Sequence, residues 1–186
     1  MSDFWFYFKI GLDHVLDYTA YDHVLFLIVL SVPYVFKDWR RVLLMVTLFT
    51  LGHTTSLLLA VYGVVRINRG LVEWLIPVTI FIAALYNVFT AGRGANKDKL
   101  GVLLIPALFF GLIHGLGFSG FFEQLTAHTS NKLLPLAEFA LGIEAAQIII
   151  TLIVLIIGFI CQTIFRFSRR DWMMFISAVV IGMVIP

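Results

Sequence analysis

The chain has 186 residues, of which 61% are hydrophobic and only 13% are charged, and its formal net charge is +2. A soluble domain of this size carries about a quarter charged residues, so this composition and a mean hydropathy of +0.99 indicate a polytopic membrane protein. Nucleic-acid binding is excluded because no basic run exists, and the single cysteine, Cys161, excludes an intrachain disulfide and a cysteine metal cluster.

Residues 1–19 come first and predict a short interfacial or re-entrant helix. No cleavable signal peptide is expected, because the start MSDFWFYFKI lacks a basic segment and a small-residue cleavage site. Apolar runs that could cross a hydrocarbon core of ~30 Å follow at 20–36, 42–65, 71–91, 100–122, 134–165 and 171–186. The last run would rise only about 24 Å, so the natural chain is expected to continue past Pro186.

These segments predict an all-α fold with one transmembrane domain over residues 1–186, a polytopic membrane bundle of about six transmembrane helices plus the short N-terminal helix. Lys and Arg concentrate in cytoplasmic loops of membrane proteins. Placing the N-terminus outside puts nine of them inside, namely Lys37, Arg40, Arg41, Arg93, Lys97, Lys99, Arg166, Arg169 and Arg170. The other four are then outside, namely Lys9, Arg66, Arg69 and Lys132. We therefore predict that both termini lie outside, and we take the membrane to be a bacterial inner membrane.

Ionisable side chains recur within the predicted spans, where each costs roughly 2.5–3.5 kcal/mol and so needs a partner or a function. They come from five spans: Asp22 and His23 begin the first, His53 lies within the second, Glu73 begins the third, His114 lies within the fourth, and Glu144 lies within the fifth, one turn from Gln147. The predicted orientation places them, together with Asp13 and His14, in the outer half or near the middle of the membrane. Convergence at one depth predicts a buried metal or proton site.

The residue types narrow the chemistry of this site. Imidazole and carboxylate groups without a thiolate suit nickel, zinc, cobalt or iron, and the sequence does not choose among these metals. A metal-bound histidine usually donates its second ring proton to a carboxylate or carbonyl oxygen. Asp13, Glu73 and Gln147 are therefore expected to support the ligands rather than to bind the ion themselves.

The stretch GLDHVLDYTAYDHVLF, residues 11–26, carries two Asp-His pairs. His14 and His23 are nine residues apart, which on one unbroken helix puts them on opposite faces. Both can face one ion only if the helix breaks near residues 18–21. The sequence therefore predicts two pieces, an N-terminal helix that folds back over the outer mouth with His14 and a span that begins with Asp22 and His23.

Glycines flank the polar positions of three spans. Gly52 precedes His53, Gly111 and Gly115 lie beside His114, and Gly142 comes shortly before Glu144. Glycine lets helix backbones approach closely in lipid, and it also permits an unwound segment where the backbone lines a cavity. Either close packing or a local unwinding is expected at these positions.

Several blocks, in order along the chain, resemble the HupE/UreJ family of small membrane proteins. Gly11–His14 followed by YDHVLF at 21–26 is similar to the family's G-x-x-H and G-x-D-H-L-L-F, and FTLGHT at 49–54 is similar to F-T-x-x-H-S. The segments FGLIHGLGF, at 110–118, and FALGIEAAQ, at 139–147, are similar to F-G-x-x-H-G-x-G-F and F-N-x-G-x-E-x-x-Q.

This family is associated with hydrogenase and urease gene clusters and is regarded as a group of nickel or cobalt permeases. The resemblance implies that a divalent ion would be bound by six residues, His14, Asp22, His23, His53, His114 and Glu144, with Gln147 in support. Tyr21, Thr54 and Ala140 depart from the family patterns. These departures suggest a divergent branch, and they bear on the choice of nickel more than on the metal site.

Two functions fit the sequence. The first is a divalent transition-metal permease, which the resemblance favours. The alternative is an intramembrane metal-dependent hydrolase acting on a lipid or a membrane peptide, with a metal-bound water as nucleophile and Glu144 or Asp22 as general base. A metal or proton sensor without turnover is a third reading. The expected partners are the metal ion and membrane lipid, and the oligomeric state is not predicted.

Overall fold

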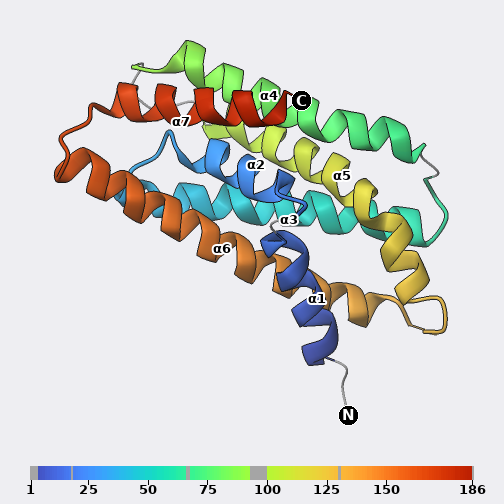
Figure 1. Cartoon of the computed structure of the whole chain (residues 1–186). Helices are drawn as coiled ribbons and strands as arrows, with labels where there is room; N and C mark the ends of the chain where they lie inside the picture. The colour runs from blue at the N-terminus through green and yellow to red at the C-terminus, as the bar shows by residue number, and fades with distance from the viewer. Residues whose placement is uncertain (1–3, 18, 66–67, 93–99, 130, 186) are drawn as a thin grey trace.

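The computed structural model describes residues 4–17, 19–65, 68–92, 100–129 and 131–185, and every regular element in them is helical (Figure 1). The elements are α1 Phe4–Leu16, α2 Asp22–Ser31, the short 3-10 helix η1 Phe36–Asp38, α3 Trp39–Val61, α4 Arg69–Thr90, α5 Leu100–Leu125, α6 Leu133–Thr163 and α7 Arg169–Val184. The all-α prediction is confirmed. Outside the described residues lie residues 1–3 of the expected N-terminal segment, the expected loop residues Arg66, Arg93, Lys97 and Lys99, and Pro186 at the end of the last expected span.

Four helical segments of the described chain are long and apolar enough to cross a membrane: Phe36–Val61, Arg69–Thr90, Leu104–Leu125 and Leu133–Thr163. They correspond to the second to fifth predicted spans. The first predicted span contains only the ten residues of α2, which rise about 15 Å, and the last contains the 16 residues of α7, which rise about 24 Å. A hydrocarbon core is ~30 Å thick, so the predicted count of about six spans is not confirmed.

Local sequence explains where three of the helices begin or end. Asn68 caps α4, since its side-chain oxygen accepts a hydrogen bond from the backbone nitrogen of Gly70 at 2.9 Å. Ser168 caps α7 in the same way, with its hydroxyl accepting from the backbone nitrogen of Asp171 at 3.0 Å. After α3 the chain turns at Gly63, whose φ of 71° lies in the left-handed region that favours glycine.

The connections α2–α3 and α6–α7 lie at one end of the bundle, and α3–α4 and α5–α6 lie at the other (Figure 1). The first end is tied together by Arg169, whose Nε donates a hydrogen bond to the carbonyl oxygen of Pro33 at 3.1 Å. The same end of the bundle carries the basic residues of the two expected inner loops that lie within the described residues. These are Lys37, Arg40, Arg41, Arg166, Arg169 and Arg170. The side of the membrane that this end faces stays a prediction.

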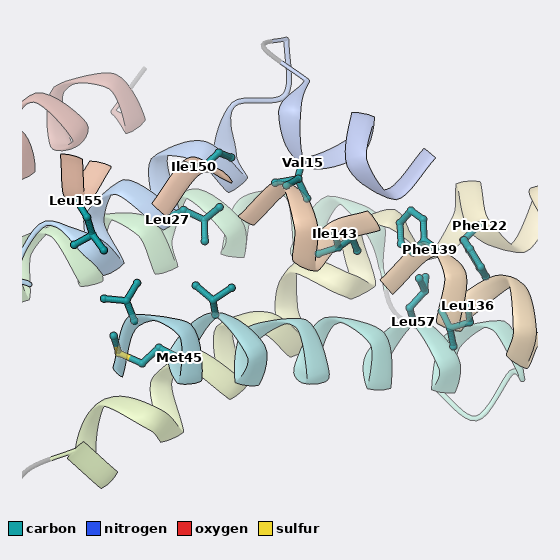
Figure 2. Close-up of a cluster of buried hydrophobic side chains, with 14 of the residues drawn as sticks. Val15, Leu27, Met45, Leu57, Phe122, Leu136, Phe139, Ile143, Ile150 and Leu155 are labelled. Carbon is teal, nitrogen blue, oxygen red and sulfur yellow. The ribbon is translucent and has the colours of Figure 1, made fainter. Parts of the chain in front are cut away.

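Helices α3 and α6 meet along a long apolar seam (Figure 2). Met45 and Leu57 of α3 and Ile143 and Ile150 of α6 belong to it, and Val15 of α1 packs into the same cluster. Lipid is as apolar as these side chains, so helix association in a membrane depends on close packing rather than on removal of apolar surface from water. The seam therefore holds α3 and α6 together through the close packing of its side chains.

Glycines set the closest backbone contacts and divide the bundle into two tight pairs, α3–α5 and α1–α6. A Cβ at Gly111 would collide with the carbonyl oxygen of Phe49, and one at Gly115 would collide with that of His53. A Cβ at Gly11 would likewise collide with the carbonyl oxygen of Phe139, and Gly142 faces the backbone of α1 in the same way. The helices run unbroken through these positions, so close packing, not unwinding, accounts for the glycines.

Candidate metal centre

Four histidines from four helices meet inside the bundle. His14 lies in the last turn of α1, His23 near the start of α2, His53 within α3 and His114 within α5. One ring nitrogen from each of His14, His23 and His53 lies within 4.8 Å of the other two. The ring centroids of His23 and His114 lie 5.2 Å apart. We call these four residues the histidine cluster.

Most ring nitrogens of the histidine cluster are buried without a hydrogen-bond partner. They are Nε2 of His14, His23 and His114, and both ring nitrogens of His53. His53 is 0% exposed and His114 is 1% exposed. A buried polar atom left unpaired costs about 1–3 kcal/mol, so this many in one place indicates a cluster built around a bound group. A divalent transition metal fits, because neutral imidazole offers it a lone pair.

His114 shows which nitrogen is free for such an ion. Its Nδ1 lies 2.9 Å from the backbone carbonyl oxygen of Phe110, one turn earlier on α5. A carbonyl oxygen only accepts, so Nδ1 must carry the proton. The other nitrogen, Nε2, then presents a bare lone pair, and it is buried without a partner. A backbone oxygen that fixes the tautomer of a histidine is the usual arrangement around metal ligands.

Phenylalanine rings form the walls of the histidine cluster. The ring centroid of Phe118 lies 3.9 Å from that of His14, and the Phe49 centroid lies 5.1 Å from that of His114. Phe139 stacks parallel to Phe118 on the α6 side. These phenylalanine rings carry no hydrogen-bond donor that would compete for the imidazole nitrogens. The imidazole rings therefore face one another in apolar surroundings.

The helix is interrupted between the two Asp-His pairs, which is where a site shared by His14 and His23 requires an interruption. Helix α1 ends at Leu16 and α2 begins at Asp22, as predicted. In the break, Asp17 Oδ1 accepts hydrogen bonds from the hydroxyl of Thr19 at 2.7 Å and from its backbone nitrogen at 2.8 Å. These hydrogen bonds, the hydroxyl's foremost, lower the pKa of the Asp17 carboxyl. The turn brings the ring centroids of His14 and His23 to 4.6 Å.

Glu144 and Gln147, also expected near the ion, lie in a separate network. The Glu144 carboxylate accepts hydrogen bonds from the hydroxyl of Thr47 at 2.6 Å and from that of Thr50. Gln147 Oε1 lies 2.8 Å from the same Thr50 hydroxyl. Glu144 does not belong to the group of His14, His23 and His53, whose ring nitrogens lie within 4.8 Å of one another.

The remaining expected residues lie outside the histidine cluster. Asp13 and Glu73 are exposed on α1 and α4, and Asp22 is half-buried beside His23 at the start of α2. In the described part of the chain, no carboxylate joins the group formed by His14, His23 and His53. The structure thus gathers the four expected histidines and leaves the expected acids apart, and metal binding by any of these residues stays a prediction.

The chain was compared with models of known protein families. The model described as HupE / UreJ protein matches residues 1–186, which is the whole chain. The chain belongs to the HupE/UreJ family. Comparisons with curated proteins and with solved structures gave no match.

In this HupE/UreJ protein, sequence reasoning missed the roles of Thr47 and Phe118. A threonine in a span usually bonds to its own helix, and Thr151 does so by donating to the carbonyl oxygen of Gln147 at 2.8 Å. Thr47 instead reaches another helix. The spacing held a signal, since Thr47 and Thr50 are three apart on α3, as Glu144 and Gln147 are on α6. Pairing the two helices required the structure.

Proposed function

We propose that this HupE/UreJ protein is a permease for a divalent transition metal of the nickel or cobalt type. One observation carries the proposal: His14, His23 and His53, from helices α1, α2 and α3, each offer a ring nitrogen within 4.8 Å of the others, and each has a buried ring nitrogen without a partner. Metal–nitrogen bonds are about 2.0–2.1 Å, so small rotations of the rings would let these nitrogens share one ion. Family membership and four apolar helices of spanning length support the same function.

The distribution of the ligands over the two tight pairs supports movement of the ion rather than permanent storage. His53 and His114 belong to the α3–α5 pair, and His14 belongs to the α1–α6 pair. Transporters commonly work by rocking one rigid unit against another around a central site. An ion held by both pairs would lose ligands when the pairs move apart, and this would release it. We propose that the site opens toward the outer side of a bacterial inner membrane.

The hydrolase alternative is less well supported. The hydrolase alternative assigns the general base to a carboxylate close to the ion, Glu144 or Asp22. Within the described residues, the Glu144 carboxylate is bonded to Thr47 and Thr50, and no acid joins the histidine group. The carboxylate expected to act as general base is thus missing from the histidine group.

Uptake by the purified protein in sealed lipid vesicles tests the proposal. Vesicles that contain a trapped metal-sensitive dye should take up Ni²⁺ or Co²⁺, and His53→Ala should abolish uptake because His53 is fully buried in the cluster. His128→Ala is the matched control, since His128 is exposed in the loop after α5. Metal that binds to the wild-type protein without entering the vesicles would rule out the permease.

A further inference from the structure

A cluster of oxygen atoms interrupts the apolar seam between α3 and α6. Thr47 and Thr50 supply it from α3, and Glu144 and Gln147 supply it from α6. Thr50 lies three residues before His53, which is a rise of about 4.5 Å along α3 toward the end that holds the α2–α3 and α6–α7 connections. The oxygen cluster is thus about one helical turn from the histidine cluster.

The oxygen cluster has more acceptors than protons. Thr50 has one hydroxyl proton, but its Oγ1 lies within hydrogen-bonding distance of three acceptors: a Glu144 carboxylate oxygen, Gln147 Oε1 at 2.8 Å and the Val46 carbonyl oxygen at 3.2 Å. The Thr47 hydroxyl donates its single proton to the other Glu144 carboxylate oxygen. With the amide oxygen facing Thr50, the cluster therefore lacks either a further proton or a cation.

The Gln147 side chain adds an independent sign of an absent partner. It is 0% exposed, and its Nε2 is buried without a hydrogen-bond partner. Turning the amide by half a turn would place nitrogen at Thr50 and leave Oε1 in the unpaired position, so one polar atom stays unsatisfied either way. With nitrogen at Thr50 the unpaired atom is the acceptor Oε1, which can bind a cation; with oxygen at Thr50 it is the donor Nε2, which a cation does not satisfy.

We propose that Thr47, Thr50, Glu144 and Gln147 form a second cation site, made only of oxygen ligands and distinct from the histidine cluster. Carboxylate, hydroxyl and amide oxygens suit hard divalent ions such as Mn²⁺ and hold nickel or cobalt more loosely than imidazole does. Two hydroxyls and an amide with a single carboxylate also supply only one negative charge. The site therefore binds a divalent ion weakly and exchanges it fast.

The position of the second site gives it a place in transport, and this reading rests on the proposed permease function. An ion that leaves His53 toward the connected ends of α2 and α3 meets Thr50 after one turn. Conduction requires sites that bind well enough to admit an ion and weakly enough to release it. A tight nitrogen site followed by a weak oxygen site satisfies both conditions.

Binding of Mn²⁺ to the purified full-length chain in detergent tests the second site, with the electron paramagnetic resonance signal of free Mn²⁺ as the readout. His53→Ala should keep Mn²⁺ binding, because the histidine cluster is separate. Glu144→Gln should weaken it by at least about tenfold, because this change removes the only charged ligand while keeping the side-chain shape. Thr50→Val should weaken it as well, and it provides a second variant should Glu144→Gln fail to fold.

Thr151→Val is the matched control, because Thr151 is a buried threonine on α6 whose hydroxyl bonds only within its own helix. Equal Mn²⁺ binding by Glu144→Gln and wild type would overturn the second site, and so would loss of binding in His53→Ala. An infrared band of protonated Glu144 that Mn²⁺ leaves unchanged would overturn it too, since a proton would then occupy the carboxylate. The measurement needs no transport, so it fails or succeeds independently of vesicle uptake.

Discussion

The imidazole rings of His14 and His23 lie with their centroids 4.6 Å apart, although nine residues along one helix would have put them on opposite faces. The chain achieves this by ending α1 at Leu16 and starting α2 at Asp22. Asp17 fixes the turn by accepting two hydrogen bonds from Thr19. The approach of His14 to His23 thus depends on the turn between α1 and α2.

Asp17→Ala should weaken metal binding several-fold without changing any ligand. An aspartate side chain that accepts from the backbone nitrogen two residues later stabilises a turn, and an asparagine can do the same. Asp17→Asn should therefore bind metal nearly as the wild type does. Titration of the purified variants with Co²⁺ checks this. If both variants bind Co²⁺ as tightly as the wild type, the turn does not position His14.

His53→Ala should remove the bound metal almost completely. His53 is 0% exposed, both of its ring nitrogens lack a partner, and it belongs to the three-histidine group. Elemental analysis of purified protein measures the metal content directly. His128→Ala, in an exposed loop, should retain the wild-type content. Full retention of metal by His53→Ala would show that the ion binds elsewhere.

A bound ion should also stabilise the fold. A ligand at 100 times its dissociation constant stabilises the native state by about 2.7 kcal/mol. Adding Ni²⁺ or Co²⁺ should therefore raise the unfolding temperature of the wild type, and a chelator should reverse the rise. The His53→Ala variant should show neither change. A rise of equal size in both proteins would mean that the metal acts at surface sites.

The convergence of the four histidines could be inferred from the sequence, but the separate position of the expected acids could not. Intramembrane histidines are few, and their depth follows from the position of each in its span, so their convergence could be inferred without knowing which helices touch. The acids were assigned to the same site on depth and resemblance alone. Glu144 lies instead with Thr47 and Thr50, because the α3–α6 contact fixes its partners, and side-chain direction around a helix was not known.

The number of spans could not be obtained from hydropathy alone. An apolar run predicts helix and depth, but it does not reveal where the helix ends. The first apolar run, 20–36, contains a ten-residue helix that is followed by a turn through Pro33. Residues 32–35 therefore lie outside the helix. The glycines left two interpretations open, close packing or local unwinding, and the backbone contacts of α3–α5 and α1–α6 decide for close packing.

Gly11→Leu should weaken metal binding although Gly11 is not a ligand. A Cβ at this position would collide with the carbonyl oxygen of Phe139, so a larger side chain must push α1 away from α6 and carry His14 with it. We expect Co²⁺ affinity to fall by roughly tenfold to a hundredfold, as is typical when a group that orients a ligand is lost.

Gly182→Leu is the matched control for this change, since a Cβ at Gly182 in α7 has no atom within 4 Å. It should leave Co²⁺ affinity unchanged. The optical spectrum of bound Co²⁺ separates the two possible causes of a loss. If Gly11→Leu lowers affinity by displacing His14, the remaining bound Co²⁺ should show fewer imidazole ligands, as His14→Ala would. An unchanged affinity in Gly11→Leu would mean that the α1–α6 contact does not hold His14 in the metal centre.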